Sequence, residues 1–325
     1  MHDLHSLGWN PHFARDAARY DATLTPWRVS EVHRDRLAAL GEAGEVSLQV
    51  PGRGAGDVAV GDWVLADADR IMRARLERQS VLHRRAAGTD IRVQLIAANI
   101  DTLFIVTSMN ADFNIARIER YLALAHDAGC TPVLVLTKAD LAGETAEKYR
   151  RDAQSIDPAL TVLALDAASP EAVTQIEQWV KPGQTAALVG SSGVGKTTLT
   201  NQLTGADAAT GAVREIDAKG RHITTSRTLR PMRHGGWIID TPGMRALRLE
   251  EASEGIDTLF ADIIEAQSRC RFSDCQHDTE PGCAVKAGLE SGELDPERLE
   301  RWRKLLAEDN RNTETVTRAR KRKGR

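Results

Sequence analysis

A glycine-rich segment at 190–197 carries the clearest chemical signal: it reads GSSGVGKT, between an apolar strand pattern and a helical pattern. The spacing G-x-x-x-x-G-K-[ST] is typical of a phosphate-binding loop. Its glycines let the backbone curl so that successive N–H groups face phosphate oxygens, and the N-terminus of the following helix adds to the attraction. We expect Lys196 to reach the β- and γ-phosphates and Thr197 to offer a hydroxyl to Mg²⁺. The predicted phosphate-binding residues are Gly190, Ser191, Ser192, Gly193, Val194, Gly195, Lys196, Thr197 and Thr198.

A second ligand for Mg²⁺ is predicted at 235–245, where the sequence reads GGWIIDTPGMR. An apolar strand that ends in Asp240 holds a carboxylate at a rigid position beside the first loop, from which it binds the metal through water. Pro242 and Gly243 then lead the chain into a loop, where the Gly243 N–H could contact the γ-phosphate. Taken alone, DTPG is also an ordinary turn after a strand.

The segment VLVLTKAD at 133–140 is another apolar strand that ends in polar residues. Guanine presents N1–H and N2–H as adjacent donors that one carboxylate can accept together, and adenine has no such pair. We therefore predict that Asp140 reads guanine while the stem of Lys138 lies over the ring. The base site is then Thr137, Lys138, Ala139 and Asp140, similar to the N-K-x-D motif of GTPases with Thr137 in the place of Asn. A surface loop with Lys138 in an ion pair is the alternative interpretation.

Three of the four cysteines fall within the segment CRFSDCQHDTEPGC at 270–283, together with one histidine. Thiolate and imidazole ligands at this spacing close a tetrahedral structural Zn²⁺ site and leave no open position for chemistry. The predicted zinc ligands are Cys270, Cys275, His277 and Cys283, and Cys130 stands apart. Unrelated buried thiols are the alternative interpretation.

The rest of the chain predicts the elements that position these groups. Apolar strand patterns at 102–108, 132–137, 160–165, 185–190 and 236–240 alternate with helical patterns at 115–128, 144–154, 171–179 and 196–203. This alternation predicts an α/β domain with a parallel sheet covered on both faces. Before it, at about 29–88, short strands and glycine-rich breaks predict a small barrel or sandwich.

Composition and charge limit the classes of protein that this chain can be. Of its 325 residues, 42% are hydrophobic and 27% charged, and no apolar run approaches the roughly 20 residues that span a bilayer. The net charge is −3, but the last 15 residues carry seven Lys or Arg against one Glu, which indicates a polyanionic partner or a solvated terminus. The arginine-rich run at 70–85 allows the same two interpretations. Membrane, collagen-like and wholly disordered proteins are excluded, and a secretory signal is not expected.

The order of the motifs is unusual, because the base-reading tetrad precedes the phosphate loop. A circular permutation of the GTPase fold explains this order. With AVGDWV at 59–64, QLIAANID at 94–101, GRHITT at 220–225 and DTPG at 240–243, the chain resembles the circularly permuted RsgA-type GTPases of small ribosomal subunit biogenesis. The resemblance implies an N-terminal extension (1–28), an OB-fold barrel (29–88), a permuted GTPase domain (89–250), a helical zinc-binding domain (251–310) and a basic tail (311–325).

The same resemblance implies a function: a cytoplasmic, monomeric GTPase that binds the 30S subunit and its rRNA, without a membrane, and hydrolyses GTP with Mg²⁺ under stimulation by the subunit. It also implies a switch threonine within GRHITT, for which Thr224 is the favoured candidate and Thr225 the alternative. Met244 stands where many GTPases have a water-orienting Gln, so His222 becomes the candidate catalytic residue, with a solvated loop histidine as the alternative. A P-loop ATPase or kinase, and a non-catalytic RNA-binding module with a vestigial nucleotide site, are the rival functions.

Overall fold

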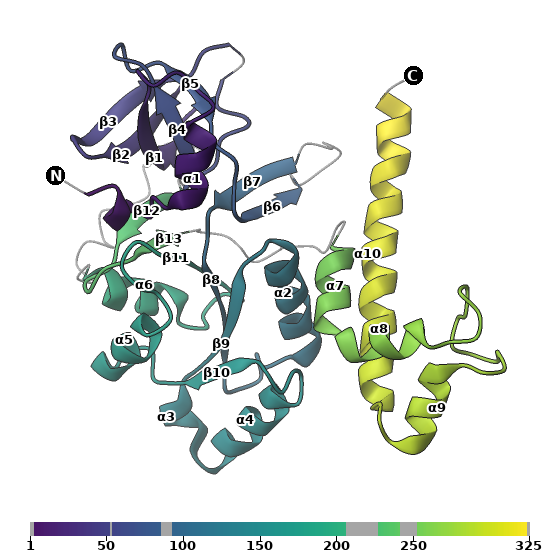
Figure 1. Cartoon of the computed structure of the whole chain (residues 1–325). Helices are drawn as coiled ribbons and strands as arrows, with labels where there is room; N and C mark the ends of the chain where they lie inside the picture. The colour runs from purple at the N-terminus through teal and green to yellow at the C-terminus, as the bar shows by residue number, and fades with distance from the viewer. Residues whose placement is uncertain (1–2, 53, 86–92, 206–226, 241–251, 324–325) are drawn as a thin grey trace.

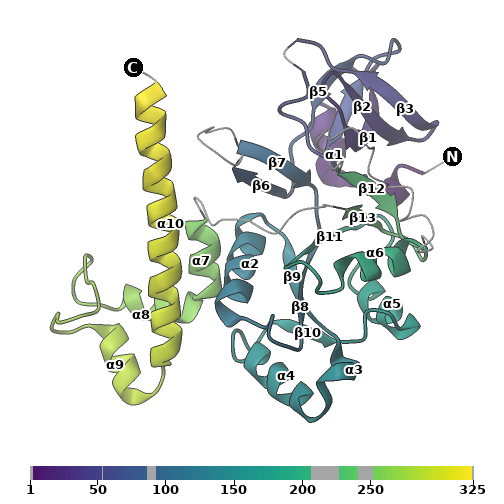
Figure 2. The same ribbon diagram turned by 180° about the vertical axis from the view of Figure 1, so that it is seen from behind.

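The computed structural model describes residues 3–52, 54–85, 93–205, 227–240 and 252–323, which form three regions along the chain (Figure 1). An N-terminal barrel lies above one end of a central α/β sheet, and a helical C-terminal region lies beside that sheet. Both views place the C-terminal region against helix α2 (Ile115–Asp127), which packs on α7 (Ser253–Leu259) (Figures 1 and 2).

The N-terminal strands form a five-stranded antiparallel sheet in the order β3-β2-β1-β4-β5. The strands are β1 (Thr25–Val32), β2 (Arg36–Gly41), β3 (Gly44–Gln49), β4 (Trp63–Ala66) and β5 (Met72–Arg75). A bridge between Gln49 and Ile71 joins the two outer strands, which curls the sheet into a small barrel. Alternate residues such as Val29, Leu37 and Leu48 fill its core. Strand β1 begins at Thr25, within the segment 1–28 that is expected to be an extension, so the barrel also contains Trp27.

Elements on either side of the barrel were not anticipated. The first residues fold into the 3₁₀ helix η1 (His5–Leu7) and helix α1 (Pro11–Ala17), whose Asn10 side chain caps the N-terminus by accepting from His12 N–H at 2.9 Å. Trp9 and Phe13 pack there against Trp63, which is fully buried in the core. After the barrel, β6 (Val81–Arg85) and β7 (Val93–Ala98) form a separate antiparallel pair.

Among the described residues, the central sheet has six strands in the order β10-β9-β8-β11-β13-β12. Five are parallel, as the sequence predicts: β8 (Thr102–Ser108), β9 (Thr131–Thr137), β10 (Thr161–Ala164), β11 (Thr185–Val189) and β13 (Trp237–Asp240). The edge strand β12 (Thr228–Pro231) is antiparallel to β13 and was not predicted.

Helices cover both faces of this sheet, because successive residues of its buried strands point alternately into two apolar cores. Leu103 and Ile105 of β8 pack with α2, whereas Phe104 and Val106 pack with α5 and α6 on the other face. The helices of this domain are α2, α3 (Ala139–Ala142), α4 (Ala146–Gln154, preceded by the 3₁₀ turn η2 at Gly143–Thr145), α5 (Pro170–Glu177) and α6 (Lys196–Thr204). The helical patterns expected at 115–128, 144–154, 171–179 and 196–203 are thus confirmed.

Four helices form the C-terminal region: α7, α8 (Ala261–Ser268), α9 (Ala284–Ser291) and the long α10 (Pro296–Lys323). Helix α10 runs alongside α7 and continues past it (Figure 2). The segment between α8 and α9 carries the cysteines. Within the described ranges, no helix combines the length and apolar composition needed to cross a membrane.

Candidate nucleotide and zinc sites

The phosphate-binding segment lies between the end of β11 and the start of α6, as the sequence predicts. Gly190 has φ +142°, and a Cβ atom there would lie 2.0 Å from the carbonyl oxygen of Val106 in the neighbouring strand β8. Gly193 and Gly195 have φ of +77° and +97°, which side chains rarely tolerate. Glycine is therefore required for this loop to curl closely over the sheet.

The polar side chains of this loop are accessible to a ligand. Thr197 and Thr198 are exposed in the first turn of α6, where backbone N–H groups have no partner inside the helix. The Lys196 ammonium donates to the carbonyl oxygens of Gly190, at 2.8 Å, and Ser191. The amine therefore lies across its own loop, within reach of a group that the loop would enclose.

The TKAD segment follows β9 at the same carboxyl edge of the sheet. Strand β8 separates β9 from β11, so the two loops lie roughly 10 Å apart, about two strand spacings. Lys138 adopts the left-handed conformation with φ +58°, a strained state for a residue with a side chain. Asp140 is exposed, and within the described part of the chain its carboxylate has no hydrogen-bond or ion-pair partner. Thr137, in contrast, is fully buried.

A third loop, after β10, closes this edge of the site. Ala139 N–H contacts the carbonyl of Leu165, and Gln202 of α6 donates to the carbonyl of Ala168 at 3.1 Å. A Cβ at Gly195 would lie 3.2 Å from Ala167. The 165–168 segment therefore contacts the base-reading segment, the phosphate-binding loop and α6.

The predicted magnesium ligand Asp240 is the last residue of β13, which pairs in parallel with β11 through Ala187 and Ile239. Its backbone position is thus at the carboxyl edge, next to the start of the phosphate loop. His222, Thr224, Thr225 and Gly243 lie outside the described residues, so their assignments stay predictions.

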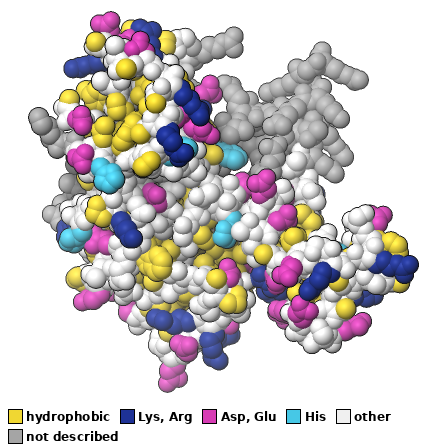
Figure 3. All heavy atoms as spheres, viewed as in Figure 1, with side chains coloured by type: hydrophobic (Ala, Val, Ile, Leu, Met, Phe, Trp, Pro, Cys, Tyr) yellow, Lys and Arg dark blue, Asp and Glu magenta, His cyan; other side chains and the backbone are white. Residues whose placement is uncertain are grey.

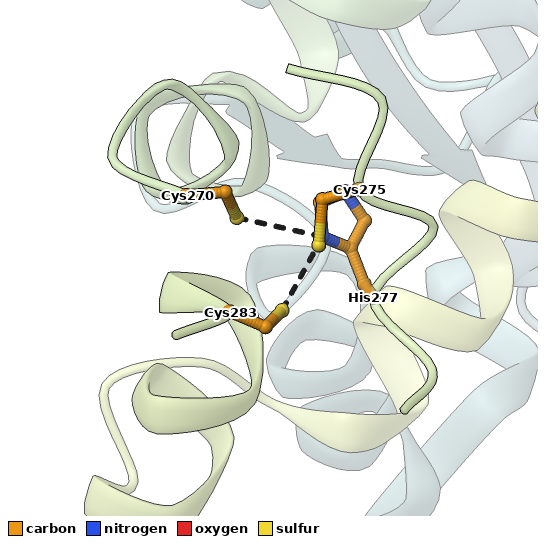
Figure 4. A group of neighbouring side chains, drawn as sticks. All are labelled: Cys270, Cys275, His277 and Cys283. Carbon is orange, nitrogen blue, oxygen red and sulfur yellow. Dashed lines mark hydrogen bonds between the residues drawn. The ribbon is translucent and has the colours of Figure 1, made fainter. Parts of the chain in front are cut away.

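The four predicted zinc ligands come together in one cluster between α8 and α9 (Figure 4). Their ligand atoms all lie within 4.8 Å of one another, and His277 Nδ1 is 3.6 Å from Cys270 Sγ and 3.5 Å from Cys283 Sγ. In a tetrahedral site with Zn–S of about 2.3 Å and Zn–N of about 2.05 Å, sulfur and nitrogen are about 3.6 Å apart. The donor set and its spacing therefore fit a closed zinc site bound through Nδ1.

The backbone around the cluster is shaped to hold it. The Glu280 carboxylate accepts three backbone N–H groups, from Gln276 at 2.8 Å, Asp278 at 2.9 Å and Thr279 at 3.0 Å. These hydrogen bonds lower the pKa of Glu280 to about 2. Cys283 Sγ caps α9 by accepting from Lys286 N–H at 3.4 Å.

Two arginines of the run at 70–85 are paired with carboxylates. Arg73 pairs with Asp67 at 2.6 Å, and Arg78 pairs at 2.7 Å with Asp62, which is fully buried. On the face shown in Figure 3, Lys and Arg side chains are interspersed with Asp and Glu over both the barrel and the C-terminal region.

Comparison with known proteins agrees with this architecture. The family model described as RsgA GTPase matches residues 75–250. A curated relative from Mesorhizobium japonicum, named "Small ribosomal subunit biogenesis GTPase RsgA", is 53% identical over 95% of this chain and 91% of its own length. A Vibrio parahaemolyticus relative, "Small ribosomal subunit biogenesis GTPase RsgA 2", is 44% identical over 96% and 87%.

Two solved structures share the fold. YloQ, titled a circularly permuted GTPase, aligns with a TM-score of 0.60 at 26% identity and covers 94% of this chain and 98% of its own. YjeQ from Thermotoga maritima aligns with a TM-score of 0.65 at 23% identity, covering 88% and 98%.

The sheet order, the phosphate loop and the preceding TKAD segment define a circularly permuted P-loop GTPase. Within that class, the chain belongs to the RsgA GTPase family. It is accordingly a GTP-hydrolysing enzyme, as the sequence predicts.

Proposed function

We propose that this GTPase binds the small (30S) ribosomal subunit, contacts its rRNA and acts in its late maturation, with GTP hydrolysis stimulated by the subunit. The observation that supports this most directly is the 53% identity, over nearly the whole chain, to a relative named for small ribosomal subunit biogenesis. A monomer in the cytoplasm, without membrane association, is part of the same proposal.

The nucleotide is proposed to bind across the carboxyl edge of the central sheet. Asp140 accepts guanine N1–H and N2–H, with Lys138 over the ring and Ala139 completing the base loop. The phosphates lie in the 190–198 loop, with Lys196 on the β- and γ-phosphates. The exposed Asp140 and the curled loop after β11, at one edge of the sheet, support this orientation.

Mg²⁺ is proposed to bind Thr197 directly and Asp240 through water, where it supplies positive charge to the phosphates. Gly243 N–H, Thr224 or Thr225 would contact the γ-phosphate or its metal, and His222 would orient the attacking water. The zinc cluster is proposed to hold one structural Zn²⁺, which fixes the 270–283 segment next to α8 and α9.

The decisive measurement is steady-state GTP turnover with and without purified 30S subunits, with Lys196→Ala as the control that removes phosphate binding. We expect the subunits to raise turnover at least tenfold and Lys196→Ala to abolish it in both conditions. Unchanged turnover on adding subunits would favour a vestigial nucleotide site. ATP competing as well as GTP would assign the chain to the ATPase class.

A further inference from the structure

The side chain of Thr137 faces the phosphate loop, although the residue belongs to the predicted base site. It is the last residue of β9 and is fully buried. Its hydroxyl oxygen lies 2.6 Å from the carbonyl oxygen of Val194 and 3.2 Å from that of Thr107. A hydroxyl has one proton, so the short hydrogen bond donates to Val194, within the GSSGVGKT segment.

Backbone and side-chain contacts of Thr137 join three strand ends. Its carbonyl accepts from Met109 N–H, just beyond β8, at 2.9 Å. Its Cγ2 methyl would lie 3.7 Å from a Cβ placed on Gly195, whose φ is +97°. The ends of β8 and β9 and the loop after β11 are thus joined through one residue, and the next residue, Lys138, is held in its strained left-handed conformation.

This arrangement separates Thr137 from base recognition. A buried hydroxyl whose proton is donated to a backbone carbonyl has no donor left for a base at the surface. Asp140, three residues later, is exposed and has a free carboxylate among the described residues. Of the two, Asp140 therefore presents the hydrogen-bonding atoms that distinguish guanine.

We propose that Thr137 is a positioning residue that fixes the base-reading loop against the phosphate loop and does not itself contact the base. The inference rests on the proposed guanine site at Asp140. The hydrogen bond sets the separation between the groups that bind the two ends of the nucleotide before it arrives. The two loops are already ordered before the nucleotide binds, so binding does not have to supply the conformational entropy of ordering them. Affinity for the nucleotide therefore rises without a new contact.

The test compares Thr137→Val, which removes the hydroxyl and keeps the shape, with Thr102→Val. Thr102 is a matched control: it is 5% exposed, lies at the opposite edge of the same sheet in β8, and donates to the carbonyl of Trp179 at 2.9 Å. Both variants remove a similar hydrogen bond. We expect Thr137→Val to raise the KM for GTP about five- to tenfold with kcat within about twofold, and Thr102→Val to change neither.

A structural readout accompanies the kinetics. Hydrogen exchange of the 190–197 peptide in the nucleotide-free protein should accelerate in Thr137→Val and stay unchanged in Thr102→Val, because only the first variant frees that loop. Thr137→Ser, which keeps the hydroxyl, should restore both the KM and the exchange rate. If Thr137→Val does not fold, Thr137→Ala replaces it, because it removes the hydroxyl without adding volume.

Three results would overturn the proposal. Equal KM values for the two valine variants would show that the hydrogen bond does not serve binding. A loss confined to kcat would place the hydroxyl in the reaction. A changed preference between GTP and XTP in Thr137→Val would make Thr137 a base reader. If only an Asp140 variant loses that preference, the guanine site at Asp140 holds and the positioning role of Thr137 is tested independently of it.

Discussion

Among single residues, burial divides the candidate nucleotide site into side chains that can contact a ligand and side chains that support them. Asp140, Thr197 and Thr198 are exposed at the carboxyl edge of the sheet, whereas Thr137 and Val194 lie beneath them. A buried hydroxyl between two loops cannot bind a nucleotide directly, but it can fix the distance between the loops that do.

Base specificity should be reversible at Asp140. Asn offers an amide N–H₂ where Asp offers only acceptors, and xanthine carries an oxygen where guanine carries its N2 amine. Asp140→Asn should therefore weaken GTP binding about 100-fold and favour XTP over GTP, in competition with a fluorescent GDP analogue. Glu144→Gln, an exposed charge nearby, is the control. Unchanged GTP affinity in Asp140→Asn would remove Asp140 from the base site.

The zinc content of the protein should depend on the three cysteines of the cluster and not on Cys130. Cys275→Ser removes one of four ligands, so zinc measured by mass spectrometry should fall from about one per chain to well below it, with a lower melting temperature. Cys130→Ser is the matched control, because burial raises the pKa of this thiol to about 12 and keeps it protonated. Similar zinc content in the two variants would contradict the proposed ligand set.

The residue types at the zinc and phosphate sites could be predicted from the sequence because their chemistry fixes their spacing. The positions of Cys270, Cys275, His277 and Cys283 follow this rule, and the structure brings all four together. The hydrogen bond of Thr137 could not be predicted, because its acceptor lies 57 residues away and becomes a neighbour only through the sheet order. Neither could the role of Glu280, which depends on how the loop folds back on it.

At the scale of whole elements, apolar runs in the sequence predict the bounds of the central strands closely. The strands that they do not predict, β12, β6 and β7, are exceptions with physical reasons. Strand β8 spans Thr102–Ser108, the predicted 102–108. The edge strand β12 has only four residues, TLRP, and most of them are polar or proline, so it carries no strand pattern. The β6–β7 pair was not predicted, because the arginines of VLHRR interrupt the apolar pattern of β6. A two-stranded sheet does not need a continuous apolar face.

One buried ion pair crosses the contact between α2 and α10. Arg301 Nε lies 2.7 Å from Glu119 Oε1, and the Glu119 side chain is only 1% exposed. Burial raises the pKa of the Glu119 carboxyl, and Arg301 acts against that shift. Removing one partner of such a pair leaves a buried charge, which is strongly destabilising, whereas replacing both by apolar groups is often tolerated.

We therefore expect Arg301→Met to lower the free energy of unfolding by about 3 kcal/mol. The double variant Glu119→Met with Arg301→Met should recover most of that loss. The comparison is the pair Arg120–Glu308 between the same two elements, whose side chains are 29% and 28% exposed. Arg120→Met should cost less than about 1 kcal/mol. Urea unfolding measures all three, and equal losses for Arg301→Met and Arg120→Met would argue against a special role for the buried pair.

In the whole molecule, a second buried charge joins the N-terminal segment, the barrel and the central sheet. Arg28 of β1 is 2% exposed and donates to the carbonyl of Leu7 and, at 2.5 Å, to the hydroxyl of Thr185 in β11. Burial lowers the pKa of this guanidinium to about 10, against the attraction of Asp101. This barrel side chain, with partners in the N-terminal segment and in the central sheet, joins the barrel to the sheet at the edge opposite the proposed nucleotide site.

Positive charge is concentrated at the C-terminal end of the chain. The last 15 residues carry seven Lys or Arg against one Glu, and α10 continues through most of them, to Lys323. The rest of the chain is acidic overall, and described arginines such as Arg73 and Arg78 are paired with carboxylates. The tail is therefore the strongest candidate for binding rRNA phosphates.

A chain ending at residue 310 should bind 30S subunits at least tenfold more weakly at about 0.1 M salt, with unchanged GTP affinity, because each phosphate that the tail neutralises releases counterions and so favours binding. The slope of log K against log salt, measured by sedimentation at several salt concentrations, should become shallower by about 0.7 to 0.9 for every phosphate that the shortened chain leaves unneutralised. A full-length variant with Gln at the tail's Lys and Arg positions separates charge from length, and it should match the truncated chain. If it binds like the natural sequence, the tail acts through its helix and not through its charge.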